Sequence, residues 1–232
     1  MESKISTIFK KTLSKFRKLI FKNYREQVLS KIISVEIEKL QKIRKKKIIK
    51  ILDFGSGYNP GLIIKIINRL TYKYKRTKFL AYCYDFYSNK ELKIMNNNSN
   101  IKFLNIKSLK DNNVVQFDFC LVVDVLHHIG LVNSRKIIYV TKKLKKISKF
   151  IIIKDHFQYG FFSNLMLLLM DFIGNYGDGV KIPRIYFSIK SFEKFLSKLN
   201  LEEIKRINDK NYYKWYWFYF NSKKLQFISI LK

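Results

Sequence analysis

Cysteine, proline, glycine and acidic residues are all scarce in this chain. Its 232 residues include two cysteines, two prolines and eight glycines, and only 17 aspartates and glutamates against 47 lysines and arginines. Cys83 and Cys120 both lie in apolar, strand-like runs, so we expect buried thiols rather than a disulfide or a metal pair. Residues at the spacing of a zinc site are also missing from the sequence, which therefore predicts no metal.

The shortage of acidic residues leaves a formal net charge of +30. Such a charge is typical of proteins that bind RNA or an anionic membrane surface. Lysine, isoleucine, asparagine, phenylalanine and tyrosine are all abundant, however, and AT-rich codons encode this whole group. Genome composition alone could therefore produce much of the charge, and both interpretations stay open.

No apolar run in the sequence is long enough to cross a bilayer. The longest one, at residues 161–174, contains Asn164 and Asp171 and is shorter than the roughly 20 residues that a spanning helix needs. The N-terminal region has scattered lysines and no continuous apolar stretch, unlike a signal peptide. We therefore expect a cytoplasmic protein, while peripheral contact with a membrane stays open.

Residues 1–47 contain neither glycine nor proline and predict two helices. Apolar residues recur there at helical spacing, first from Ile5 to Ile20 and then from Val28 to Leu40. This pattern favours a basic helical cap whose apolar stripe packs on the rest of the protein while its lysines face water. A helix that faces a membrane or RNA is the alternative.

From residue 48 onward, strand-like and helix-like runs alternate. The strand-like runs lie at 48–54, 79–85, 101–105, 117–124 and 150–154, and the helix-like runs include 60–70 and 134–147. Such alternation predicts a parallel sheet wound by right-handed crossovers. The tail differs, because a helix at 188–199 precedes two strand-like runs, 201–207 and 225–231, with no helix between them. These two runs predict an antiparallel hairpin.

The most informative motif is IIKILDFGSGYN, at residues 48–59. Its continuous apolar run is typical of a strand buried on both faces. Gly55 and Gly57 allow a sharp turn and let a ligand lie against bare main chain. A helical pattern then begins at Pro60, where the third glycine of a dinucleotide fingerprint would stand. Strand, glycine turn and helix start together indicate a nucleotide-type binding site of another kind.

Acidic residues lie at the ends of four predicted strands, namely Asp53, Asp85, Asp124 and Asp155. Ligands of an open parallel sheet bind beyond the carboxyl ends of its strands, so we expect these four side chains at one edge. Buried carboxylates are costly without partners. A ligand with hydroxyls and an ammonium group would satisfy them.

These motifs resemble those of class I S-adenosylmethionine-dependent methyltransferases. DFGSG resembles motif I of that family, and FDFCLVVDVLHHI, at residues 117–129, resembles motif IV and the turn after it. The resemblance covers a domain at residues 48–232. It implies an α/β, Rossmann-like fold with a seven-stranded, mostly parallel sheet in the order 3-2-1-4-5-7-6. Helices would cover both faces, and the N-terminal helical cap would precede them.

The same resemblance implies S-adenosylmethionine as the cofactor. Asp53 would hold its methionine end, and Gly55 and Gly57 would let it approach the main chain. Asp85 would accept both ribose hydroxyls, since the two oxygens of a carboxylate can take two donors.

Three more residues complete the cofactor site that the resemblance implies. Asp124 and Val125 would lie along the methionine side. Many family members carry an acid near the end of the third strand for the adenine, but this chain has none there. Asn105 or a backbone carbonyl is the candidate in its place. His127 and His128 are expected to pack or to begin a helix, and a general-base role for either is the alternative.

The segment after the fifth strand resembles a bacterial subgroup of this family that carries Lys-Asp-His at the same point. We expect Asp155 and His156 to orient the acceptor and to remove its proton. The long segment at 156–187 would form a lid together with residues 1–47. For Asp171 within it, a role in the site and a role in closing the helix both stay open.

The function that follows is methyl transfer to a small or medium acceptor, at oxygen or nitrogen. No cysteine ends a strand at the site, which argues against a cysteine nucleophile. The Asn/Asp-Pro-Pro-Tyr motif of enzymes that methylate amino groups of nucleic acid bases is missing as well. Two alternatives stay open: an RNA methyltransferase guided by the basic surface, and a non-catalytic binding protein with a methyltransferase-like fold.

Overall fold

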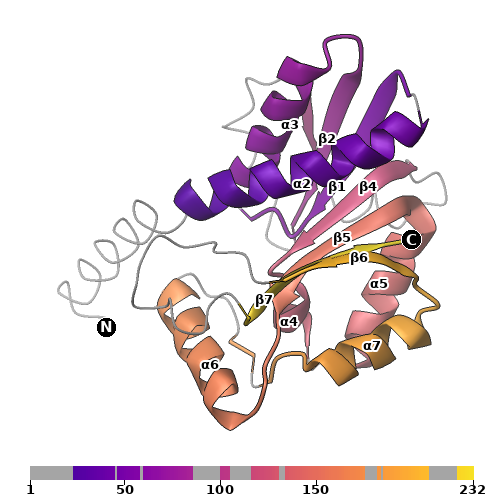
Figure 1. The fold of residues 1–232 in the computed structure, drawn as a ribbon. Coiled ribbons are helices and arrows are strands. Elements are labelled where there is room, and N and C mark those ends of the chain that lie inside the picture. The colour runs from indigo at the N-terminus through magenta and orange to yellow at the C-terminus, as the bar shows by residue number, and fades with distance from the viewer. Residues whose placement is uncertain are drawn as a thin grey trace.

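The computed structural model describes residues 23–44, 46–57, 60–85, 100–104, 116–130, 134–175, 182–183, 185–208 and 224–232. Helices and strands alternate along most of this chain (Figure 1). In order they are α2 (Asn23–Arg44), β1 (Ile48–Phe54), α3 (Gly61–Lys73), β2 (Lys78–Tyr84), β3 (Ile101–Phe103), β4 (Phe117–Val123), α4 (Leu126–Ile129), α5 (Arg135–Ile147), β5 (Ser148–His156), α6 (Phe161–Asn175), α7 (Ile189–Lys198), β6 (Glu203–Ile207) and β7 (Gln226–Leu231).

The seven strands form one sheet in the order β3-β2-β1-β4-β5-β7-β6, which confirms the predicted order. The first five strands pair in parallel. β7 pairs antiparallel with both β5 and β6, so the predicted terminal hairpin is also present. The carboxyl ends of β1, β2, β4 and β5 therefore meet at one edge, where the sequence places its candidate site.

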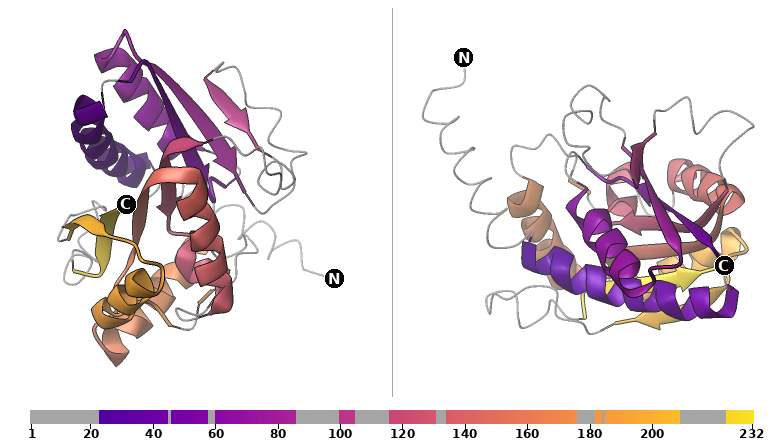
Figure 2. Two further views of the ribbon diagram at one scale, coloured as in Figure 1. Left: turned by 90° about the vertical axis from the view of Figure 1, so that its right-hand side faces the viewer. Right: turned by 90° about the horizontal axis from the view of Figure 1, so that it is seen from above.

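Helices cover both faces of the sheet, and the side-chain alternation of the strands explains how (Figure 2). In β1, Ile49 and Ile51 pack with α2 and α3, whereas Leu52 and Phe54 belong to the core shared with α5 and α7. Successive side chains of a strand point to opposite faces. The continuous apolar sequence of β1 therefore fills two cores at once, as predicted for a central parallel strand.

The N-terminal cap is described from Asn23 onward, and its first predicted helix, at 5–20, lies outside the described residues. The second predicted stretch, 28–40, lies within α2. Leu29, Ile33 and Ile37 are buried there against α3, which is the packing that their spacing predicts. An ion pair of 2.7 Å between Glu36 and Lys205 ties α2 to β6 as well.

Several strands differ in length from the prediction, among them β5 and β3. β5 extends to His156, two residues beyond the predicted end, because β7 pairs with its last two residues: Asp155 lies opposite Phe227, and His156 lies opposite Gln226. β3 spans only 101–103, since it is an edge strand that pairs with β2 over three positions. The candidate adenine contact, Asn105, lies outside the described residues.

Cys83 and Cys120 are buried free thiols, as predicted. Within the described ranges, no helix has the length and apolar character needed to span a membrane.

Candidate active site

The glycine turn after β1 is anchored on the end of β2. The backbone N–H groups of Gly55 and Ser56 donate to the carbonyl of Tyr84, at 2.7 and 3.2 Å. Gly55 and Gly57 have φ angles of +83° and +67°, in the left-handed region that glycine adopts readily. The sequence prediction of a sharp glycine turn therefore describes a backbone conformation that other residues would adopt only at a cost.

Asp53 places a buried carboxylate beside this turn. The residue is only 5% exposed, and none of the described residues donates a hydrogen bond to it. Burial, and then the nearby charge of Asp85, raise its pKa to about 7. A carboxylate held in this way favours a positively charged ligand, which would supply both a donor and a compensating charge.

Asp85 follows β2 and faces the same turn. Its Oδ2 accepts a hydrogen bond of 2.6 Å from the backbone N–H of Gly57. Asp53, Gly57 and Asp85 thus lie together at the carboxyl ends of neighbouring strands, where the sequence places them.

Val125 connects this turn to the second half of the site. A Cβ added to Gly55 would lie 2.3 Å from Cγ2 of Val125, so the two residues are in direct contact. Val125 precedes α4, which begins at the end of β4. The glycine turn after β1 and the start of α4 are therefore adjacent.

The end of β5 supplies three consecutive functional side chains to two sides of the sheet. Nζ of Lys154 donates to Oδ1 of Asp124 at 2.5 Å, and Nδ1 of His156 lies 3.7 Å from the same oxygen. Asp155, between them, instead lies against Nδ1 of His127 in α4, with Oδ1 at 2.6 Å. Strand alternation thus divides the Lys-Asp-His sequence between two neighbouring clusters.

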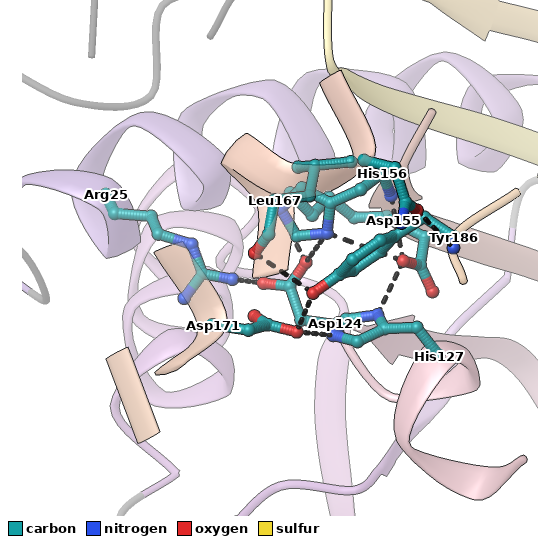
Figure 3. Close-up of polar contacts among 10 residues, drawn as sticks. Arg25, Asp124, His127, Asp155, His156, Leu167, Asp171 and Tyr186 are labelled. Carbon is teal, nitrogen blue, oxygen red and sulfur yellow. Dashed lines mark hydrogen bonds and ion pairs between the residues drawn. The ribbon is translucent and has the colours of Figure 1, made fainter. Parts of the chain in front are cut away.

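The first cluster brings Arg25 of α2 into the site, where its guanidinium forms an ion pair with Asp124 (Figure 3). Asp124 has a φ of +53° at the end of β4. Lys154 is fully buried, and burial, followed by the charge of Arg25, lowers its pKa well below the usual value. The carboxylate of Asp124 therefore binds two basic side chains of the protein itself.

The second cluster is centred on His127, which lies between two carboxylates. Its Nε2 is 3.4 Å from Oδ2 of Asp171, opposite the hydrogen bond to Asp155. Burial alone would lower its pKa, but Asp155 and Asp171 together outweigh burial and raise it to about 9. His127 is therefore an imidazolium at neutral pH. In turn, despite burial, its charge holds the pKa values of both acids below their usual range.

Tyr186, near the end of the long segment at 156–187, contacts this cluster. Its hydroxyl lies 2.5 Å from Oδ2 of Asp171 and 3.0 Å from the carbonyl of Leu167. Burial and the charge of Asp171 raise the pKa of the Tyr186 hydroxyl, so it remains a donor. Asp171 therefore contacts both His127 and Tyr186, beyond any role in closing α6.

His156 has the opposite character to His127. Burial and the neighbouring Lys154 lower its pKa to about 3, so its imidazole is neutral at neutral pH. Its Nδ1 is buried and makes no hydrogen bond to any described residue. A neutral imidazole can accept a proton.

Among the described residues, two sets of side chains are close enough to be considered as metal ligands: His127 with His128 and Asp171, and His127 with Asp155 and His156. Two donors on one zinc ion lie about 3.3 Å apart, given metal–ligand distances near 2 Å. The 2.6 Å contact between His127 and Asp155 is instead a hydrogen bond. The arrangement is accounted for by hydrogen bonds and ion pairs, and the sequence prediction of no metal stays a prediction.

Sequence reasoning did not single out Arg25 or Lys154 for the site, and it considered His127 only as an alternative general base. The carboxylate partners of His127 lie far away in sequence. Arg25 is one basic residue among many, so no local pattern singles it out. Lys154 did carry a signal, because a lysine that interrupts a buried apolar strand needs a partner.

Comparison with family models and with curated proteins gives no match. Solved structures do share the fold. Loganic acid methyltransferase with S-adenosylhomocysteine is 13% identical, with a TM-score of 0.59, over 90% of this chain and 94% of that one.

Two longer proteins share the fold over part of their length. An O-methyltransferase family 2 protein from Planctomyces limnophilus in complex with apigenin is 12% identical, with a TM-score of 0.54, over 79% of this chain. LepI in complex with S-adenosylmethionine is 12% identical, with a TM-score of 0.52, over 80% of this chain. The present chain spans 50% and 43% of those two proteins. These similarities confirm the predicted Rossmann-like methyltransferase fold.

Proposed function

We propose that this protein transfers a methyl group from S-adenosylmethionine to an oxygen or nitrogen atom of a small or medium-sized acceptor. The observation that carries the proposal is the buried carboxylate of Asp53, which lies beside a glycine turn and receives no hydrogen bond from the described residues. The shared fold supports it, since similar structures hold S-adenosylmethionine or S-adenosylhomocysteine.

The residues around the glycine turn fit this cofactor. Asp53 would bind the ammonium group of the methionine part, whose charge compensates its own. Gly55 and Gly57 would leave the main chain open to the ligand, because no Cβ stands in the way. Asp85 would accept the ribose hydroxyls.

The wall beyond the turn would come from the start of α4. We assign Val125 to this wall, together with the backbone of Asp124, whose carboxylate is occupied by Arg25 and Lys154. Asn105 stays the predicted contact for the adenine.

When bound, the cofactor supplies an electrophilic methyl group on a sulfonium. The protein's own contribution is then to position the acceptor and to take up its proton. We assign the contact with this proton to His156, whose imidazole is neutral at neutral pH and can accept a hydrogen bond from the acceptor; its low pKa makes it a weak base in the free protein. Asp155 is completely buried and cannot reach an acceptor. It would act as a positioning residue, because it binds Nδ1 of His127 and accepts a hydrogen bond of 2.8 Å from the backbone N–H of His156.

Calorimetric titration with S-adenosylhomocysteine tests the cofactor site. Wild-type protein should bind, and Asp85→Asn should bind at least tenfold more weakly, because an amide offers one acceptor oxygen where the carboxylate offers two. Asp118→Asn is the matched control. Asp118 is also a buried acid, but it lies at the opposite edge of the sheet, with Lys46 at 2.6 Å. Failure of the wild-type protein to bind would refute the proposal.

Transfer itself is tested with labelled S-adenosylmethionine and fractionated cell extract. Label in a small-molecule fraction that disappears with His156→Ala supports the assignment. Label in an RNA fraction would instead make RNA the acceptor. Cofactor binding without label in any fraction would identify a non-catalytic binding protein.

A further inference from the structure

Helix α6 belongs to a segment that leaves the sheet and returns to it at one place. Phe157 and Phe187 form a parallel bridge, and the N–H of Gln158 donates to the carbonyl of Phe187 at 2.7 Å. The chain between them carries α6 below the sheet, apart from the helices that cover its faces (Figure 1).

The inner face of α6 is fixed by Tyr186. Oδ1 of Asn164 accepts a hydrogen bond of 3.3 Å from the N–H of Tyr186, whose hydroxyl contacts Leu167 and Asp171. Positions 164, 167 and 171 recur at helical spacing, so they form one stripe. This stripe includes Asp171, the only charged residue of the helix.

The outer face of α6 is apolar and exposed. Phe162 is 83% exposed and Phe161 75%, far more than aromatic side chains that form a core. The exposed apolar residues of the helix are Phe161, Phe162, Leu165, Met166, Leu169 and Phe172. Because Asp171 belongs to the inner stripe, this face has no charge. A contiguous apolar surface of this kind marks a binding site for another protein or for a membrane.

We propose that the outer face of α6 docks on the surface of an anionic lipid bilayer. The helix has 15 residues and is too short to span, but an apolar face of this size suits a helix that lies in the plane of the interface. The chain's net charge of +30 complements anionic headgroups.

The sequence that precedes Lys224 has the composition of a membrane interface. Residues 209–223 lie outside the described part, and their sequence is DKNYYKWYWFYFNSK. The next residue is Lys224, whose carbonyl accepts a hydrogen bond of 2.9 Å from the hydroxyl of Tyr159, just before α6. Tryptophan and tyrosine together with lysine are the residues that favour the boundary between lipid and water.

A bilayer fits this face better than two other occupants. A second copy of the chain would bring one net charge of +30 against another, and the two would repel. RNA would find no cationic side chain on this face of α6. The inference goes beyond methyl transfer and does not depend on it.

Co-sedimentation with vesicles tests the proposal. Wild-type protein should bind vesicles of equal parts phosphatidylglycerol and phosphatidylcholine. The double variant Phe162→Glu/Leu169→Glu should bind at least tenfold more weakly. The control is Tyr72→Glu/Tyr139→Glu, which adds the same charge at exposed residues of α3 and α5 and should bind nearly as well as the wild-type protein. Urea unfolding of each variant checks that the fold is kept.

Equal weakening in both double variants would overturn the proposal, because charge alone would then explain binding. Absence of wild-type binding would also overturn it. Size-exclusion chromatography with light scattering tests whether a second copy of the chain covers this face. A dimer that dissociates only in Phe162→Glu/Leu169→Glu would assign the face to a second copy instead.

Discussion

Replacing Asp53 with asparagine should stabilise the protein at neutral and alkaline pH while weakening cofactor binding. The pKa of Asp53 is raised from 3.8 to about 7 in the folded protein. At about 1.36 kcal/mol for each pKa unit, ionisation of this buried group lowers the free energy of unfolding by about 4 kcal/mol above pH 7. A buried amide without a full set of partners costs about 1 to 3 kcal/mol, so a net gain of about 1 to 3 kcal/mol remains.

The stability difference between Asp53→Asn and the wild-type protein should depend on pH. Below pH 3.8 Asp53 is protonated in both the folded and the unfolded state, and it contributes no penalty. As the pH rises toward 7, the unfolded chain ionises first, so the folded state loses stability. The advantage of Asp53→Asn should therefore grow by about 2.5 kcal/mol between pH 5 and pH 8.

Urea unfolding of both proteins at these two pH values measures the difference, and other titrating groups cancel because they are common to both. Asp118→Asn is the control and should lower the free energy of unfolding, because Asp118 accepts hydrogen bonds from Lys46 and, at 3.0 Å, from the N–H of Lys50. If Asp53→Asn is less stable than the wild-type protein at pH 8, the Asp53 carboxylate is not a site of electrostatic penalty, and the main support for a cationic ligand is lost.

Three further changes test other parts of the site. Gly55→Ala should lower the free energy of unfolding by about 1 to 3 kcal/mol, because of the positive φ and the contact with Val125, and wild-type stability in urea would contradict this. His156→Ala should lower kcat far more than cofactor affinity, and equal losses in kinetics and calorimetry would indicate a structural role. The charged form of His127 stabilises the fold fully below pH 6.5, and this contribution, about 3 kcal/mol, is lost as the pH rises through 9. The stability deficit of His127→Gln in urea should therefore shrink between pH 6 and pH 10, and a constant deficit would show that His127 is not charged.

The sheet could be predicted from the sequence because its signals are local or topological. A continuous apolar run, a glycine turn and a helical pattern follow one another at residues 48–70, and handedness rules leave few ways to connect such units. The strand-end acids could be placed for the same reason. Their sequence positions fix which edge of the sheet they occupy.

The pairing of charges within the site could not be predicted. His127 is protonated and His156 neutral, although both lie near the carboxyl edge of the sheet, close to aspartates. The difference arises because Asp155 and Asp171 flank the first, whereas Lys154 adjoins the second. The two acids that flank His127 come from distant parts of the chain. No local pattern shows which histidine will be surrounded by acids.

The bridge between Phe157 and Phe187 has an evolutionary consequence. The segment between Phe157 and Phe187, which carries α6, begins and ends at adjacent backbone positions. Its length can therefore change without shifting the register of the strands. A change in the length or sequence between Phe157 and Phe187 would therefore alter the surface that α6 presents, while the carboxyl ends of β1 and β2 keep their positions.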